Sequence, residues 1–420
     1  MEYLVDIWQK YLPHARWFAS KGLPISSVSI RPLPWYTTTD QIWVRSELLE
    51  VDLVDLVETY HLLVGYLELG TGEPEALIGT CELDGRGMAD VVDVPSSPSA
   101  MRALLTALVS PDAHGVHWHM TPPSPTSSTS VFSGEQSNTT VRIGEDTLFK
   151  VLRKITPGPN LESATMAALG PSTVIPRLIG TLSSPDSVYE LGIFSEWVSH
   201  ARDGWSYCLE ACQAGRSITD EIYDLGVALK ALHTNMAEVF GTSTIEGSLI
   251  ASAMRSRLES ACSQVEEISG WRTSLNSVFH CDPAPIQIQR VHGDFHLGQA
   301  LISGSGWTII DFEGEPLKSP EERAAPDSVY RDIAGLIRSL DYVRSTLSAH
   351  RGDWVEQWYL EARKSFLDGY LGIEELQTNL LRAYEVDKAI YEMVYEARNR
   401  PSWTDIPRRA IQDIIEELEK

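Results

Sequence analysis

The order of strand-forming and helix-forming segments is the feature that most constrains the fold of this 420-residue chain. After a short helical opening, residues up to about 90 are rich in β-branched and aromatic side chains that partly alternate with polar ones, as in strands. Residues 139–143 and 147–152 form a second strand-rich block around a Gly-Glu-Asp turn. After about residue 203 the apolar residues recur at helical spacing. Strands followed by helices predict an α+β protein rather than an alternating βαβ sheet.

Charge limits the partners that we expect for this chain. It has 34 Lys+Arg against 58 Asp+Glu, a formal net charge of −24, which argues against nucleic acid and anionic membranes as partners. The first residues carry charges where a signal peptide would be apolar, and no apolar run reaches the roughly 18 residues of a membrane span. The five cysteines are few and odd in number. We therefore expect a cytoplasmic protein without a disulfide framework.

One segment, RVHGDFHLGQALISGSGWTIIDFEGEP at positions 290–316, combines residues suited to phosphoryl transfer. That reaction needs a carboxylate that deprotonates the attacking hydroxyl, and oxygen ligands that hold Mg²⁺ against the phosphates. Asp294 suits the first role, with His292 as a second candidate catalytic residue. The candidate metal ligands are Gln299, Asp311 and Glu313. The alternative is a buried His/Asp network at a strand–loop junction, and His296 suits either a structural hydrogen bond or substrate binding.

This segment resembles the HRD-to-DFG region of protein kinases, in the His-Gly-Asp form found in aminoglycoside-phosphotransferase-like small-molecule kinases. The resemblance implies that Lys150, in the strand TLFKVLRK, binds the phosphates of ATP, although an isolated strand lysine is usually just solvated. The glutamate that usually pairs with this lysine would fall near Ala164. This chain has Glu162 instead, about half a helical turn earlier. We expect Glu162 to take that role.

The same resemblance implies two further parts of a nucleotide site. The loop between residues 133 and 139 would cover the phosphates with its backbone amides and polar side chains, and its candidate residues are Ser133, Gly134, Gln136, Ser137 and Asn138. The segment at the end of the strand-rich part would be the hinge, whose backbone binds the adenine of ATP. Its candidate residues are Glu196, Trp197 and Val198.

A closer resemblance is to the maltokinases of actinobacteria, carried by GEQSNTT, FKVLRK, RVHGDFHLGQ, IDFEGEP and YEARNRPSW. It implies a bilobal eukaryotic-like kinase fold that phosphorylates maltose to maltose 1-phosphate with ATP and Mg²⁺, for α-glucan synthesis and often alongside trehalose synthase. The implied parts are an N-terminal α+β cap subdomain (1–90), an intermediate subdomain and kinase N-lobe with nucleotide loop and hinge (91–200), and a helical C-lobe with the catalytic and sugar sites (201–420).

The sugar site is expected on the helix YEMVYEARNRPSW, near the C-terminus. Tyr395, Glu396 and Arg400 lie close to one-turn spacing, and Pro401 ends the helix so that Trp403 stands beside it. Aromatic rings and charged groups together suit a sugar. The alternative is a surface ion pair between Glu396 and Arg400 with the tyrosine in the core.

Two functional alternatives remain open. The first is a kinase of the same fold that acts on another sugar, such as glucosamine or glucose. The second is a pseudokinase that docks on a trehalose-synthase-like enzyme, which only the displaced glutamate favours.

We expect Asp332, at the start of the helix RDIAGLIRS, to brace the catalytic loop rather than to touch substrate. The acidic net charge is compatible with all of these, because ATP would arrive with Mg²⁺ and a neutral sugar needs no basic steering.

Overall fold

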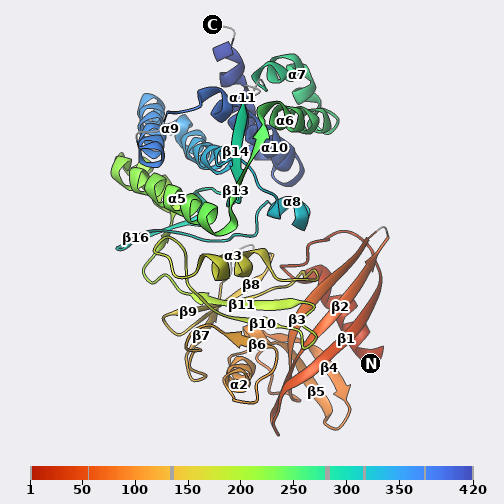
Figure 1. Ribbon diagram of the computed structural model, residues 1–420. Coiled ribbons are helices and arrows are strands. Elements are labelled where there is room, and N and C mark those ends of the chain that lie inside the picture. The colour runs from red at the N-terminus through yellow and green to blue at the C-terminus, as the bar shows by residue number, and fades with distance from the viewer. Residues whose placement is uncertain are drawn as a thin grey trace. The chain divides into compact units, whose positions relative to one another are not determined.

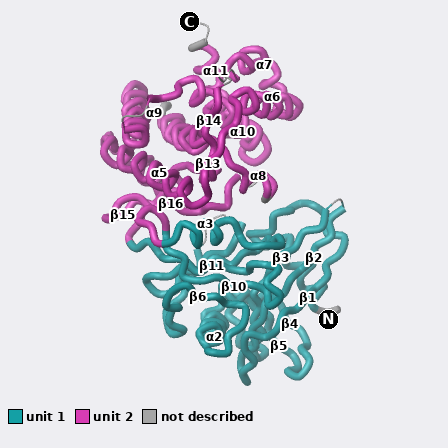
Figure 2. The backbone as a smooth tube through the Cα atoms, viewed as in Figure 1, with its two compact units in different colours: residues 1–170, 176–199 teal, residues 171–175, 200–420 magenta. Residues whose placement is uncertain are grey.

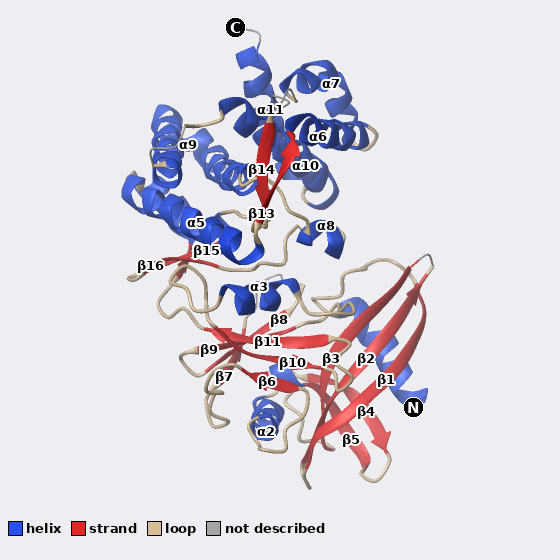
Figure 3. Ribbon diagram, viewed as in Figure 1, coloured by secondary structure: helices blue, strands red, loops and turns tan. Residues whose placement is uncertain are grey.

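The computed structural model describes residues 2–54, 56–132, 137–279, 284–315, 318–372 and 375–418 (Figure 1). They form two compact units, unit 1 (1–170 and 176–199) and unit 2 (171–175 and 200–420), coloured teal and magenta in Figure 2. Strands dominate unit 1 and helices dominate unit 2 (Figure 3), which confirms the expected α+β class. The finer division of unit 1 near residue 90 stays a prediction. Among the described helices, none has the length and apolar character that a membrane crossing requires.

Unit 1 opens with helix α1 (Glu2–Tyr11) and a five-stranded antiparallel sheet in the order β1-β2-β3-β5-β4. Its strands are β1 (Ile25–Thr38), β2 (Ile42–Leu53), β3 (Leu56–Glu68), β4 (Leu77–Leu83) and β5 (Gly87–Asp93). Helix α1 packs against the sheet through Trp8, which is fully buried in the apolar cluster beneath it. The Trp8 indole N–H donates to Glu47 Oε2 at 3.2 Å, so this large side chain is buried without an unpaired polar group.

The second sheet of unit 1 has six strands in the order β6-β10-β11-β9-β8-β7. They are β6 (Val116–Trp118), β7 (Thr129–Val131), β8 (Thr139–Ile143), β9 (Thr147–Val151), β10 (Leu178–Ser183) and β11 (Glu190–Glu196). In β8 and β9 buried residues alternate with half-buried ones, as the period of two requires. The helices of this part are α2 (Pro98–Leu108) and α3 (Leu161–Leu169).

Arg153 joins the two sheets of unit 1. It is fully buried and follows β9 by two residues. Its guanidinium holds both carboxylate oxygens of Asp93, at the end of β5, at 2.8 and 2.9 Å. The same group donates to Thr139 Oγ1 at 2.9 Å and stacks over Trp17. Because a buried charge must be paired, these contacts fix β9 relative to the N-terminal sheet.

Unit 2 is mainly helical, with α4 (Gly204–Ala214), α5 (Thr219–Phe240), α6 (Gly247–Cys262), α7 (Glu266–Val278), α8 (Pro320–Ala324), α9 (Tyr330–Leu371), α10 (Thr378–Asn399) and α11 (Asp405–Leu418). Two small sheets accompany the helices: β12 (Arg202–Asp203), β15 (Ala300–Ser303) and β16 (Gly306–Ile309) in one, and β13 (Thr242–Glu246) and β14 (Pro285–Gln289) in the other. Gly226 of α5 and Gly369 of α9 allow these helices to touch, because a Cβ at either would collide with the backbone of the other. Helix α9 breaks at Gly352, whose φ is 43°.

Candidate active site

The loop between β14 and β15 carries the His-Gly-Asp motif, and the first turn of α9 holds it. The carboxylate of Asp332, fully buried, accepts the backbone N–H of His292 at 2.7 Å and that of Gly293 at 2.8 Å. It also bonds His233 Nε2 at 2.9 Å. Burial alone would raise the pKa of Asp332, but the His233 contact lowers it below its ordinary value, so the carboxylate stays charged. The expected bracing role of Asp332 is confirmed.

His292 and His296 differ in their surroundings. The His292 ring is 3% exposed; Nε2 bonds the carbonyl of Ile310 at 2.9 Å, and Nδ1 faces the Asp294 amide. This geometry ties the motif to the strand end before Asp311, which makes His292 a positioning residue rather than a group that touches substrate. His296 lines a pocket of unit 2, and its Nδ1 accepts the Gly298 N–H at 3.0 Å. Burial lowers the pKa of His296, which favours the neutral ring.

Asp294 has a buried cationic partner that sequence reasoning missed. Lys388 Nζ, on α10, lies 3.0 Å from Asp294 Oδ1 and 2.9 Å from Glu315 Oε1. Burial would lower the pKa of Lys388, but Glu315 and Asp294 raise it well above its ordinary value. Burial would likewise raise the pKa of Glu315, yet Lys388 and Arg331 hold it far below its usual range. Lys388 is therefore a charged ammonium, and Glu315 beside it is a carboxylate. The sequence did contain one sign of this contact. Lys388 lies one helical turn before Glu392, so the two charged residues share a face of α10, whose other residues are mostly buried.

The three candidate metal ligands lie close together in unit 2. Gln299 Nε2 donates to Asp311 Oδ2 at 3.0 Å, which leaves the Gln299 amide oxygen for another partner. Carboxylate oxygens of Asp311 and Glu313 lie within 4.8 Å of each other. Asp311 has φ 66°, the left-handed region that non-glycine residues rarely adopt, and such strain often marks functional positions. Oxygen donors of this kind suit Mg²⁺, so the residues present fit that ion.

In unit 1, Lys150 and Glu162 form an ion pair. Lys150 Nζ on β9 lies 2.6 Å from Glu162 Oε2 on α3, and both side chains are largely buried. The side chain of Asn160 caps α3 by accepting the Glu162 N–H at 2.8 Å, so Glu162 stands in the first turn. The displacement of this glutamate along the sequence therefore does not break the pair.

The other candidate nucleotide residues have varied surroundings. Ser133, Gly134 and Gln136 lie outside the described residues. Ser137 is exposed, whereas Asn138 is buried and its Oδ1 accepts the Arg153 N–H at 3.1 Å. Asn138 thus anchors the end of the loop to the chain that follows β9.

The proposed hinge follows β11, and two of its residues already have partners within unit 1. Glu196 forms an ion pair with Arg177, with N–O distances of 3.0 and 2.9 Å. The Trp197 N–H donates to the carbonyl of Asp146 at 2.8 Å. Val198 is half-buried. The side chain of Glu196 and the amide of Trp197 are therefore engaged in holding this segment against its neighbours.

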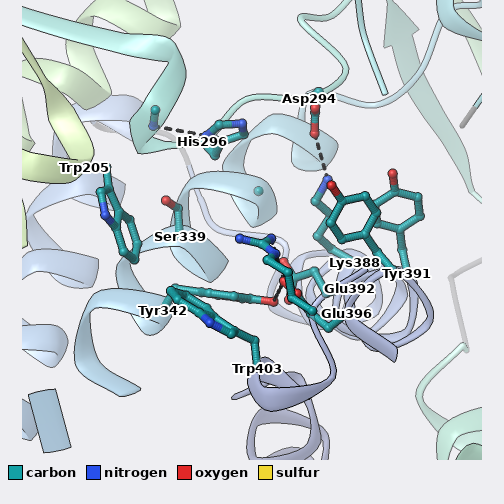
Figure 4. Close-up of a pocket in the computed structure, with 14 residues that line it drawn as sticks. Trp205, Asp294, His296, Ser339, Tyr342, Lys388, Tyr391, Glu392, Glu396 and Trp403 are labelled. Atoms are coloured by element: carbon teal, nitrogen blue, oxygen red, sulfur yellow. Dashed lines mark hydrogen bonds and ion pairs between the residues drawn. The ribbon is translucent and has the colours of Figure 1, made fainter. Parts of the chain in front are cut away.

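A pocket of about 440 Å³ in unit 2 brings the candidate base and the candidate sugar residues together (Figure 4). Asp294 and His296 come from the catalytic loop, and Tyr395, Glu396, Arg400 and Trp403 from α10 and the turn after it. Further lining residues that sequence reasoning missed are Trp205, Ser339, Tyr342 and Lys388. The rings of Tyr342 and Trp403 stack with centroids 6.3 Å apart, which gives the pocket an aromatic wall.

Glu396 presents an unusual polar group to this pocket. Its side chain is 2% exposed, and Oε1 accepts from Arg400 at 2.8 Å and from the Tyr342 hydroxyl at 3.2 Å. Oε2 is buried and has no hydrogen-bond partner among the described residues. Burial raises the pKa of Glu396 against the effect of Arg400. An unpaired buried acceptor is costly, and a ligand could reach this oxygen only after a movement of the surrounding side chains.

Comparison with known proteins finds a family model for the N-terminal part of the chain and relatives over two thirds of it. Residues 11–95 match the family model of the maltokinase N-terminal cap domain. A glucosamine kinase of Streptacidiphilus jiangxiensis is 26% identical over 317 residues, which cover 67% of this chain and 72% of that protein. A glucosamine kinase of Mycolicibacterium smegmatis is 25% identical over 320 residues, which cover 67% of this chain and 78% of that protein.

A solved structure of a glucosamine kinase in complex with glucosamine, ADP and inorganic phosphate matches with a TM-score of 0.68 and 22% identity. The match covers 97% of this chain and 99% of the other. A further crystal form of a glucosamine kinase gives the same TM-score at 20% identity. The fold expected from the sequence is confirmed: it resembles that of the glucosamine kinases, and residues 11–95 match the maltokinase N-terminal cap domain.

Proposed function

We propose that this maltokinase-like kinase transfers the γ-phosphoryl group of ATP to a hydroxyl of a sugar bound in the unit 2 pocket. The observation that carries the proposal is the pocket itself, where Asp294 shares one cavity with Glu396 and Trp403, about a hundred residues further along the chain. An aromatic wall beside carboxylates suits the apolar face and the hydroxyls of a sugar. A carboxylate at the same cavity suits deprotonation of one of those hydroxyls.

Each residue then has a distinct task. Asp294 accepts the proton of the attacking hydroxyl, and Lys388 holds the Asp294 carboxylate toward the pocket. Gln299, Asp311 and Glu313 would hold Mg²⁺, which when bound neutralises charge on the phosphates. Lys150, oriented by Glu162, would steady the phosphates from unit 1. The remaining nucleotide-loop and hinge residues keep the roles given by the kinase resemblance.

The Lys150–Glu162 pair also bears on the pseudokinase alternative. That alternative depended on the missing glutamate near Ala164, and the 2.6 Å pair supplies a glutamate from about half a helical turn earlier. Asp294, Gln299 and Asp311 are all present, and a protein without catalysis would not need them all. These facts support an active kinase.

Two acceptors have specific support. Glucosamine is the acceptor that we favour, because a carboxylate, Glu396, lines the pocket and because two relatives are named glucosamine kinases. Maltose is the second candidate, because the cap domain matches the maltokinase model and because Trp403 and Tyr342 form a broad aromatic wall. Both acceptors present hydroxyls that Asp294 can deprotonate.

A coupled assay of ADP release tests the proposed function. Purified protein with Mg-ATP is offered glucosamine, maltose, glucose and kanamycin in turn, and the ratio kcat/KM is compared. We expect glucosamine to give the highest ratio. Maltose as the best acceptor would overturn the preference for an amino sugar, and nucleotide binding without ADP release for any sugar would restore the pseudokinase alternative.

The variant Glu396→Gln tests the acceptor contact. Losing a charge-assisted hydrogen bond to the sugar should lower kcat/KM for glucosamine by about 10- to 100-fold, with a smaller loss for glucose. The matched control is Glu361→Gln, an exposed position on α9. An equal loss of kcat/KM for glucosamine and for glucose would mean that Glu396 does not contact the amino group.

A further inference from the structure

Unit 1 contains a separate cavity of about 310 Å³ that none of the kinase residues lines. It lies where the end of β1, the last turn of α2 and the following loop meet. Its polar lining side chains are Tyr36, Thr37, Thr106, Ser110, Asp112 and His114. The size is in the range of small-molecule sites.

The walls of this cavity select against anions. All of its lining residues are described, and none is a lysine or an arginine. Asp112 adds a carboxylate, and the end of α2 at Leu108 adds the negative end of the helix dipole. A phosphate or carboxylate would therefore meet no counter-charge. A purely apolar ligand would bury the hydroxyls of Thr37 and Ser110 without compensation. A neutral compound with many hydroxyl groups matches both conditions.

His114, which also lines the cavity, has a ring nitrogen without a hydrogen-bond partner among the described residues. Its ring stacks on Tyr36, with centroids 5.4 Å apart and an interplanar angle of 15°, so its orientation is fixed. Nε2 is buried and makes no hydrogen bond within the described part of the chain. The cavity therefore has an ordered pair of rings along one side, and a ligand would reach Nε2 only after a movement of the surrounding side chains.

Tyr36 connects the cavity to β9 through a buried chain of hydrogen bonds. The Tyr36 hydroxyl lies 3.0 Å from Ser46 Oγ, and Ser46 Oγ lies 2.9 Å from His61 Nε2. His61 Nδ1 lies 3.0 Å from the carbonyl of Leu152, directly after β9. Ser46 and His61 are fully buried.

The donor and the acceptor of each hydrogen bond in this series can be assigned. Burial and the nearby Arg153 charge lower the pKa of His61 to about 3, so the ring is neutral. The Leu152 carbonyl can only accept, so Nδ1 carries the proton and Nε2 must accept from Ser46. Ser46 in turn accepts from Tyr36. A displacement of Tyr36 therefore disturbs an ordered series of donors that ends two residues from Lys150.

We propose that this cavity is a second ligand site, for a neutral polyhydroxyl compound of mono- or disaccharide size, and that its occupancy is transmitted to β9 through Tyr36. The site lies outside the acceptor pocket, and binding there requires no catalysis. Its test is therefore separable from that of the proposed function.

Hydrogen–deuterium exchange of the full-length protein locates binding. Glucose, maltose, sorbitol and inorganic phosphate are the probes. We expect at least one of the three polyols to slow exchange in peptides covering residues 104–116, separately from any effect on α10.

Ala107→Trp, which fills the cavity, should abolish this protection. Asp112→Asn should weaken binding about tenfold, the scale of one lost charged hydrogen bond. The control Asp84→Asn, exposed between β4 and β5, should behave as wild type.

Isothermal titration with Mg-ATP tests the transmission. Saturation with the protecting polyol should change the Kd for Mg-ATP by about fivefold or more. In Tyr36→Phe, which keeps the ring and removes the hydroxyl, the polyol should still bind but the change in Kd should disappear. Protection by phosphate alone, no protection near residue 110 by any polyol, or protection that survives both Ala107→Trp and Asp112→Asn would overturn the site. An unchanged Kd for Mg-ATP in the wild type would overturn the transmission.

Discussion

Replacing Asp294 with asparagine should lower sugar-dependent ADP release by about 10²- to 10⁴-fold, the range that a positioned general base contributes. The amide keeps the size of the side chain but cannot take the proton of the attacking hydroxyl. Asp294 belongs to unit 2 and lines the sugar pocket, whereas Lys150 and Glu162 belong to unit 1. Affinity for Mg-ATP should therefore stay within about twofold of wild type, as measured by isothermal titration.

The interpretation of Asp294→Asn needs a check on folding, because Lys388 loses one of its two carboxylate partners. Urea unfolding of the variant gives that check. The control is Asp353→Asn, an exposed aspartate of α9 that should leave both activity and stability unchanged. Near-wild-type turnover in a folded Asp294→Asn protein would exclude Asp294 as the base.

Replacing Lys388 with methionine should have the largest effect on stability. The substitution removes the ammonium shared by Asp294 and Glu315; Glu315 keeps Lys318 at 2.7 Å, whereas Asp294 loses the cation beside it. Breaking a buried ion pair from one side typically costs about 3–5 kcal/mol, because the remaining charge is buried without compensation. We expect a loss of that size in the free energy of unfolding, measured by urea denaturation. Turnover should fall as well, since Asp294 loses the contact that orients it.

A double variant separates charge from packing at this position. In Lys388→Met combined with Asp294→Asn the carboxylate that lost its cation is neutralised, so part of the lost stability should return. Lys388→Arg keeps the charge and should retain most of the stability. If Lys388→Met unfolds at the same urea concentration as wild type, the ion pairs of Lys388 do not carry the stability that their burial implies.

Sequence patterns predicted those features of the fold that are determined by residues close together in the sequence. The β8 and β9 strands follow from their alternation. Asp294 and Asp311 were proposed, and stay predictions, because phosphoryl transfer asks for a carboxylate base and for oxygen ligands of Mg²⁺. Such features need no knowledge of the distant chain.

The Lys388 contacts show why the rest could not be predicted. Asp294 and Lys388 are 94 residues apart in the sequence, and only the packing of α10 against the catalytic loop brings them together. The same holds for Trp205 and Tyr342, which reach the pocket from α4 and α9. A periodic pattern identifies a buried helix face but does not identify the side chains that it will meet.

The cap of α3 has a consequence for the way in which related sequences are compared. Asn160 sets where the helix begins, and the helix start decides which residue faces the lysine strand. A chain can thus move its glutamate along the sequence and keep the contact, provided that the cap moves with it. An alignment column without a glutamate can then reflect a shifted helix start, so the distance from cap to carboxylate is the better guide to whether the ion pair is kept.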